Sequence, residues 1–452
     1  MNIGSKPLPG LLAVAVGLAV AAPACADAVT DWNLVYDQVS PVVGPPPHRA
    51  HLGALVHVAI HDALNNIDPR YQTYTVPTPA PAYASPQAAI AAAARDVLVD
   101  RLGCVPVPTP AMQAACTTVA NAYTNALAAI PDGPAKSAGI AAGRQAAHAI
   151  LALREGDGSE NPDPPYTLAA AAGVYQPTAP NFPVPGEAAV GKWTPFAMRS
   201  QSQFRSDPGE IFDLTGKVYT RDYNEVKRVG ALNVRAAAPD SAETDIARFW
   251  PAGGANWNLV TRTIIANRGM HDLWDEARLL ALARMAETDG MIQVFDTKYT
   301  YTFWRPVTAI HWTGNYGNPA TPAAPDWMPF FSFPGPWSTP PYPDYTCGLP
   351  TASGANVEVL RRYFGTDKVG YSLTVTLPAL VSPPQPSPFP AGYALPARTV
   401  TRSYASLSQA ANESASARVY AGIHFRSGCT LAITKGEQVG RFVIQHYLKP
   451  LK

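Results

Sequence analysis

Two short segments in the C-terminal half of the chain carry basic side chains at spacings that suit an anion site. Lys298 and Arg305 stand seven residues apart, with aromatic residues between them. Residues seven apart share one face of a helix, so the two cations are predicted to converge on one anion. Arg offers a planar fork for a tetrahedral oxyanion, and Lys adds a point charge. Arg418 and His424, six apart, can reach a shared site if the neighbouring turns are helical. For either segment alone, a surface charge pair and a hydrogen-bonded histidine is the alternative.

Other residues that could do chemistry are less specific. His57 and His61 stand four apart, a spacing that can chelate a metal on a helix, but the apolar residues around them favour a core helix. Tryptophans and phenylalanines further along could form an apolar mouth over the site or pack a proline-rich loop, and the sequence does not separate these alternatives. These aromatic residues are Trp304, Trp312, Trp327, Trp337, Phe330, Phe331 and Phe333.

The segments that contain these residues are predicted to be mainly helical. Helical periodicity recurs along the chain, whereas alternation typical of a strand is nearly confined to Ser372–Leu377. The sequence therefore predicts a mainly α protein with long proline-rich connections at 76–86, 161–187, 318–346 and 378–397. The predicted helices are 50–66, 87–102, 136–154, 242–250, 257–270, 272–292, 354–364, 404–422 and 434–448.

The N-terminus and the charge balance indicate where the protein acts. Lys6 precedes an apolar run, Leu11 to Ala22, that ends at Ala24-Cys25-Ala26, which is typical of a cleaved secretory signal over residues 1–26. We expect an exported bacterial protein, periplasmic or secreted, with no transmembrane segment after cleavage. A formal net charge of +1 argues against nucleic acid or an anionic membrane as partner. A small molecule is the expected partner, and a homo-oligomer is left open.

Domain division and disulfides follow from the remaining patterns. The 452 residues suggest an N-terminal helical region, 27–200, and a C-terminal helical region, 201–452, that carries the oxyanion site. Without Cys25, four cysteines remain, which is typical of disulfides in an oxidising compartment. Cys104 and Cys116 flank a short loop and are expected to pair, which leaves Cys347 with Cys429. Zinc binding is the competing interpretation, but the sequence has no CxxC motif or Cys/His cluster to support it.

At these motifs the sequence resembles the superfamily of vanadium-dependent haloperoxidases and type 2 phosphatidic acid phosphatases. That superfamily carries K-x6-R-P, then P-S-G-H, then S-R-x5-H-x3-D. Lys298 and Arg305-Pro306 match the first motif, and Arg418 and His424 match the third. The resemblance covers most of residues 48–448 and is to the bacterial haloperoxidase-like branch.

The resemblance implies two packed helical bundles around a buried oxyanion site. Lys298, Arg305 and Arg418 would neutralise the equatorial oxygens of vanadate or phosphate, and the backbone N–H of Gly348 would contact the anion. His424 would bind vanadium axially, or attack phosphorus in a phosphatase. A vanadate centre of this family uses hydrogen peroxide to oxidise halide.

The middle motif departs from the family pattern. Where P-S-G-H is expected, the chain has Thr346-Cys347-Gly348-Leu349, so Leu349 replaces the histidine that serves as general acid and base. His311 and Asp344 are the candidates to supply the missing acid. In the third motif Gly428 replaces the aspartate, so His424 is expected to lack its orienting carboxylate. Cys347 and Cys429 belong to segments that line one pocket in the family, so the resemblance also implies that their sulfurs are close.

Three functions remain open on the sequence. The first is a haloperoxidase-like enzyme that oxidises halide or organic molecules with altered acid–base chemistry. The second is a phosphate-ester hydrolase that acts through His424. The third is an inactive homologue whose pocket only binds a ligand.

Overall fold

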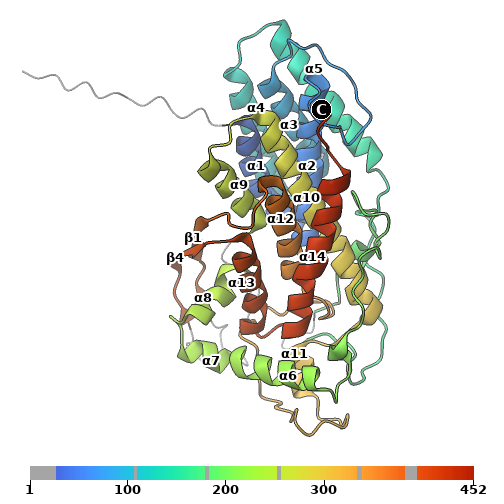
Figure 1. Cartoon of the computed structure of the whole chain (residues 1–452), viewed down its shortest axis with the longest axis vertical. Helices are drawn as coiled ribbons and strands as arrows, with labels where there is room; N and C mark the ends of the chain where they lie inside the picture. The colour runs from blue at the N-terminus through green and yellow to red at the C-terminus, as the bar shows by residue number, and fades with distance from the viewer. Residues whose placement is uncertain are drawn as a thin grey trace, which may run out of the picture.

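The computed structural model describes residues 27–105, 109–178, 183–251, 256–332, 338–381 and 394–451, and in these ranges the chain is mainly helical (Figure 1). The predicted signal segment lies outside the described residues. The α-helices are α1 (Ala28–Val39), α2 (Pro46–Ile67), α3 (Pro86–Arg101), α4 (Pro110–Ala128), α5 (Pro134–Leu153), α6 (Lys217–Val229), α7 (Leu232–Ala237), α8 (Ala242–Phe249), α9 (Trp257–Arg268), α10 (Leu273–Tyr301), α11 (Pro306–His311), α12 (Gly348–Phe364), α13 (Leu407–Tyr420) and α14 (Arg426–His446). The 3-10 turns are η1 (Ser40–Val43), η2 (Ala189–Lys192) and η3 (Glu210–Phe212).

The strands form two small antiparallel pairs. β1 (Tyr371–Leu377) pairs with β4 (Arg398–Tyr404), with Tyr371 opposite Tyr404, and β2 (Leu380–Val381) pairs with β3 (Ala394–Leu395). Alternate residues of β1 are buried, as its sequence pattern predicts. The mainly α prediction is confirmed, and the segments that the periodicity missed include α1, α4 and α6.

The first bundle is built around α2, which is buried from Ala50 to Ile67 on every side. It packs against α3, α5 and α10, and α1 and α4 complete the bundle. A helix with neighbours on every side has no solvent-exposed polar face, and its buried polar residues, such as His57 and His61, have hydrogen-bond partners instead. The predicted disulfide between Cys104 and Cys116 is present and joins the end of α3 to α4.

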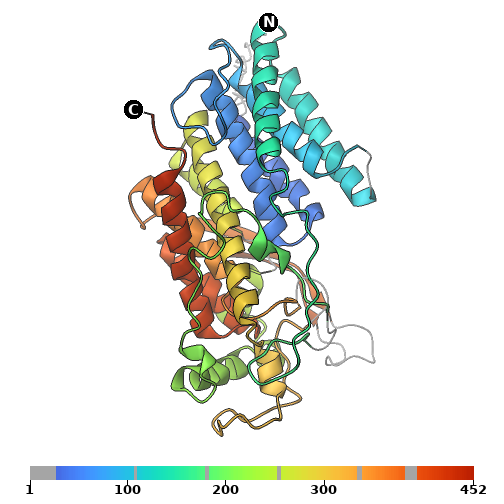
Figure 2. The same ribbon diagram turned by 90° about the vertical axis from the view of Figure 1, so that its right-hand side faces the viewer.

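The second bundle consists of α10, α12, α13 and α14. Figure 2 shows α10 (yellow) between the blue helices of the first bundle and the orange and red helices of the second. Gly354 of α12 lets α14 approach closely, because a Cβ there would overlap the carbonyl oxygen of Ile433. The fold thus places the N-terminal ends of α12 and α14 beside the last turns of α10.

None of the helices in the described part of the chain combines the length and apolar character that a membrane crossing requires. The division of the chain near residue 200 stays a prediction.

Candidate functional site

A cavity of about 450 Å³ opens between the two bundles. Its walls come from the N-terminal part of the chain, from the turn before α9, from α10 and from the start of α12. Aromatic and proline side chains line it together with a few charged groups. The lining residues include Tyr36, Pro41, Pro46, Arg49, Trp250, Trp257, Arg284, Glu287, Phe295, Tyr342, Gly348, Leu349 and Arg418.

Lys298 and Arg305 do not share a helix face, and that part of the prediction is wrong. Thr302 takes a left-handed conformation that ends α10, with φ of 50°. Arg305 is extended at the N-cap of α11, as a residue before proline prefers. The two cations are brought together by this break rather than by a continuous helix.

Lys298 is fully buried at the end of α10. Its Nζ donates to the carbonyl oxygens of Pro343 (2.9 Å) and Asp344 (2.8 Å). Burial holds the pKa of Lys298 well below its ordinary value, and the neighbouring charges of Arg305 and Arg418 lower this pKa further. The ammonium therefore stands in a pocket already rich in positive charge.

Arg305 is also fully buried and contacts two other segments of the chain. Its Nε donates to the carbonyl oxygen of Tyr342 (2.7 Å), and Nη1 donates to the carbonyl oxygen of Ile423 (2.9 Å). Nη1 also lies 2.9 Å from Nε2 of His424. Its Nη2 has no hydrogen-bond partner in the described part of the chain. A buried N–H without a partner is costly, so this atom is a candidate anion ligand.

His424 has a carboxylate partner, contrary to the expectation from Gly428. Its Nδ1 lies 2.8 Å from Oδ1 of Asp344, and both side chains are buried. A Cβ on Gly428 would lie 3.9 Å from Oδ2 of Asp344. The Asp344 carboxylate therefore occupies the space beside residue 428, where the family pattern has its aspartate. The replacement comes from a segment about 80 residues away, which the motif at 418–428 alone could not reveal.

The electrostatics of His424 and Asp344 follow from burial among cations. Burial, together with the charges of Arg305, Lys298 and Arg418, holds the pKa of His424 well below its ordinary value, so the imidazole is neutral. Burial raises the pKa of Asp344 to about 7, although Arg305 and Lys298 act in the opposite direction. Asp344 therefore exchanges a proton near neutral pH.

Arg418, near the end of α13, faces the cavity together with the start of α12. It is 8% exposed, and its Nε has no hydrogen-bond partner among the described residues. Burial lowers its pKa to about 10. Gly348 and Leu349 line the same cavity, so the leucine that replaces the family's acid–base histidine faces open space.

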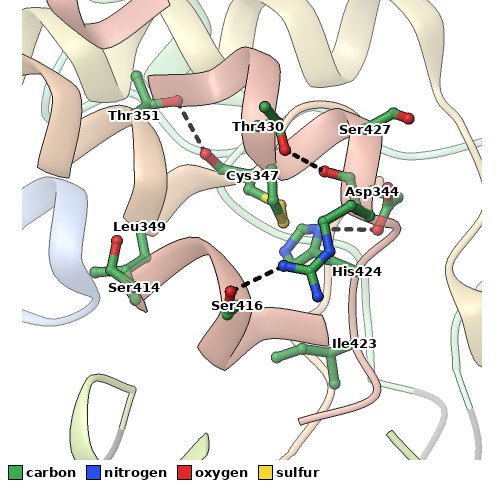
Figure 3. The surroundings of a disulfide bond; sticks show 12 residues. Asp344, Cys347, Leu349, Thr351, Ser414, Ser416, Ile423, His424, Ser427 and Thr430 are labelled. Atoms are coloured by element: carbon green, nitrogen blue, oxygen red, sulfur yellow. Dashed lines mark hydrogen bonds and ion pairs between the residues drawn. A yellow bond between two sulfur atoms is a disulfide. The ribbon is translucent and has the colours of Figure 1, made fainter. Parts of the chain in front are cut away.

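The second predicted disulfide, between Cys347 and Cys429, is present at the centre of this region (Figure 3). Both cysteines are fully buried. Figure 3 shows His424 and Asp344 beside the bridge, with Leu349 on its other side. The bridge joins the N-terminal ends of α12 and α14.

His311 lies elsewhere. Its Nε2 is 2.6 Å from the carbonyl oxygen of Trp327, and it lines a different cavity with Trp312 and Gln176. None of the contacts of His311 among the described residues is with the cluster of Lys298, Arg305, Arg418 and His424. Asp344, the other candidate acid, is in direct contact with His424.

The other candidates behave as packing residues. His57 and His61 are fully buried in α2, bonded to Asn33 and to the carbonyl oxygen of Gln72. Trp304 and Trp327 pack in one apolar cluster, and Phe330 and Phe331 pack in another. Trp337 and Phe333 lie outside the described residues. The aromatic residues that do face the cavity include Trp250, Trp257, Phe295 and Tyr342.

Sequence reasoning missed Tyr342. Its ring centroid lies 5.1 Å from Nζ of Lys298 and 5.0 Å from Cζ of Arg305, and the ring faces the cavity. Its position in the sequence, just before the divergent middle motif at 346–349, could have identified Tyr342 as a candidate.

Comparison with known proteins gives a consistent result. Residues 278–452 match the family model described as the VCPO second helical-bundle domain. The vanadium chloroperoxidase of Curvularia inaequalis is 26% identical to this chain, over 72% of this chain and 62% of that protein, so the chain spans less than two thirds of the relative.

Solved structures show the same fold. A bacterial vanadium-dependent iodoperoxidase superposes with a TM-score of 0.69 at 21% identity, covering 94% of this chain and 98% of that one. The holo form of a bacterial vanadium-dependent chloroperoxidase gives 0.62 at 17% identity, covering 91% and 93%.

Proposed function

We propose that the chain, which resembles the vanadium-dependent haloperoxidases in sequence and has their fold, binds vanadate at Lys298, Arg305, Gly348, Arg418 and His424. We further propose that it uses peroxide to oxidise a halide or an organic molecule. The observation that carries this proposal is the charge of the cluster. Lys298, Arg305 and Arg418 are all buried, and Nη2 of Arg305 and Nε of Arg418 have no hydrogen-bond partner among the described residues.

The fit to a tetrahedral oxyanion rests on these donors. Lys298, Arg305 and Arg418 would hold its oxygens, with the backbone N–H of Gly348 at the start of α12. A Cβ on Gly348 would meet no atom within 4 Å, so there is open space in front of this backbone. In the structure, Nη1 of Arg305 lies against Nε2 of His424. A bound anion would draw the Arg305 guanidinium toward itself and leave Nε2 of His424 available as a ligand. Bound vanadate would supply activation of peroxide for a two-electron oxidation.

Asp344 is proposed to do two things in this site. Its contact with Nδ1 fixes the orientation of the His424 ring, so that Nε2 faces the cations. Its pKa of about 7 lets it hold or release a proton at working pH, a role that Leu349 cannot perform.

Vanadate binding and catalysis together test the proposal. The chain, freed of metal and oxyanions, is titrated with orthovanadate, and iodide oxidation is then followed with hydrogen peroxide. We expect saturable binding and vanadate-dependent oxidation. Arg418→Ala should weaken vanadate binding by about 10- to 100-fold, since a hydrogen bond to a charged group is worth about 1.5–3 kcal/mol.

Arg228→Ala, which removes an exposed arginine outside the cavity, is the matched control and should bind normally. Saturable binding of vanadate without any oxidation of iodide would support the third function, an inactive homologue that only binds a ligand. Ester hydrolysis that vanadate inhibits would support the phosphatase alternative. Absence of saturable binding would contradict the proposed site.

A further inference from the structure

Glu276, in the first turn of α10, is a buried carboxyl without a hydrogen-bond partner. Its side chain is fully buried, and neither of its two carboxyl oxygens has a partner among the described residues. A buried carboxylate without a donor or a cation is costly, because burial removes its hydration. Burial and, after it, the nearby carboxyls of Asp27, Asp272 and Asp275 raise the pKa of Glu276 to about 9. The position therefore lacks a cation that would stabilise the charged carboxyl.

Asp27, which caps α1, is in contact with this buried carboxyl. Its side chain lies within hydrogen-bond reach of Glu276. Asp27 is half-buried, and its Oδ1 accepts a hydrogen bond from the main-chain N–H of Val29 (2.9 Å). The main-chain nitrogen of Asp27 is bonded to the same Cα as this side chain, and it precedes the first helical residue. This nitrogen therefore stands close to Glu276 and is not needed for the hydrogen bonds of α1.

The packing of α1 on α10 explains why these two residues meet. A Cβ on Gly53 would lie 2.7 Å from the hydroxyl oxygen of Tyr36 and 3.2 Å from Cδ of Arg284, so Tyr36 and Arg284 are neighbours. Arg284 stands eight residues after Glu276, and Tyr36 stands nine residues after Asp27. At about 1.5 Å per residue, the two spacings differ by only about 1.5 Å along the helix axes. The two helices therefore run side by side in the same direction, with their N-terminal ends together.

The sequence before Asp27 can supply the missing cation. Ala24 and Ala26 are the small residues that signal peptidase requires, which predicts cleavage between Ala26 and Asp27. Cleavage converts the main-chain nitrogen of Asp27 from an amide into an α-amine, which is protonated below about pH 8. The dipole of α1 opposes a positive charge at this end of the helix, and the carboxyls of Asp27 and Glu276 would offset that effect.

From this arrangement we infer that the chain is processed between Ala26 and Asp27 and that the new α-ammonium group of Asp27 forms an ion pair with the Glu276 carboxylate. Hydrolysis of the peptide bond consumes one water molecule and leaves a carboxylate on Ala26 and an ammonium group on Asp27. The ion pair joins the start of α1 to the start of α10. Because α1 supplies Tyr36 and Asp37 to the cavity wall, processing also stabilises that wall. This role of Glu276 is independent of vanadate binding.

The test uses the full 452-residue chain exported from a bacterium. N-terminal sequencing of the purified protein should show a chain that begins at Asp27. In a second protein, one asparagine is inserted between Ala26 and Asp27, which moves the α-amine one residue away from Glu276. We expect the insertion and Glu276→Gln each to lower the melting temperature by at least about 2 °C. In the protein with the insertion, Glu276→Gln should no longer lower it, because the ion pair is already absent.

Glu210→Gln, which changes an exposed carboxyl in η3, is the matched control. Its effect on the melting temperature should be the same with and without the insertion. The N-terminal sequence does not depend on the stability of any variant, and a chain that begins at another residue would overturn the inference. So would an insertion that leaves the melting temperature unchanged, or an effect of Glu276→Gln that is equal with and without the insertion.

Discussion

At the scale of single residues, the carboxylate that contacts His424 comes from a different segment than in the family pattern. Gly428 removes the carboxylate that the family pattern places after His424, and Asp344 places its own carboxylate in that space. Lys298, Arg305, Arg418 and His424 could be named as candidates from the motifs that the sequence shares with the family, and Asp344 could be named as a candidate acid. The contact between Asp344 and His424 could not be predicted, because it joins segments about 80 residues apart.

Leu349 faces the cavity in the position of the family's acid–base histidine. Leu349→His should therefore raise vanadate-dependent iodide oxidation by about 10²–10⁴-fold, the usual contribution of general acid–base catalysis. Vanadate affinity should change little, because the cations are untouched. The measurement is kcat for iodide oxidation at saturating vanadate. Leu349→Gln, similar in size but unable to transfer a proton, is the control, and an equal gain in that variant would contradict the explanation.

Asp344 should make anion binding depend on pH. Above a pKa of about 7 its carboxylate is charged and repels the anion, so affinity should fall as pH rises. Molybdate, a tetrahedral dianion over this range, should bind roughly tenfold more weakly at about pH 8 than at about pH 6, a difference of one pKa unit in free energy. The measurement is calorimetric titration at both pH values. Asp344→Asn should remove the fall of molybdate affinity with rising pH. If the affinity of that variant still falls with pH as in the original protein, another group, such as Lys298, causes the pH dependence.

At the scale of elements, the cluster is assembled by helix ends. Lys298 is in the last turn of α10, Arg305 caps α11, and Cys347 caps α12. Periodicity predicted α10 and α12 but not α11, and it placed the end of α10 at 292 and the start of α12 at 354. The sequence does not show where such a helix ends, since a left-handed residue such as Thr302 is held by tertiary contacts rather than by its own preference.

Close packing of α12 on α14 fixes the position of Cys347 and Gly348. Gly354→Ala should destabilise the fold by about 1–3 kcal/mol, because the added methyl group overlaps the carbonyl oxygen of Ile433. Thermal unfolding followed by circular dichroism measures this change. Gly290→Ala in α10 is the control, since its methyl group would find its nearest neighbour at 3.4 Å and helix propensity favours alanine. Equal stability of the two variants would show that the close approach is not required.

At the scale of the whole molecule, the two bundles meet along α2 and α10, and the cavity lies between them. The mainly α class and both disulfide pairs could be predicted from composition, periodicity and cysteine number. The cavity walls could not, because they combine Tyr36 and Pro46 from the first bundle with Trp257 and Tyr342 from distant segments. Such a surface is determined by how the bundles pack, which no local pattern encodes.

Lys298, Arg305, Arg418 and His424 are proposed to bind one tetrahedral oxyanion. Anomalous diffraction from crystals of the protein grown with tungstate, a heavy analogue of vanadate, would locate that anion. We predict one strong anomalous peak within hydrogen-bond distance of Arg305 and Arg418, with Nη1 of Arg305 drawn away from Nε2 of His424. A map with no peak at the N-terminal end of α12, and with Arg305 still bound to His424, would contradict the account.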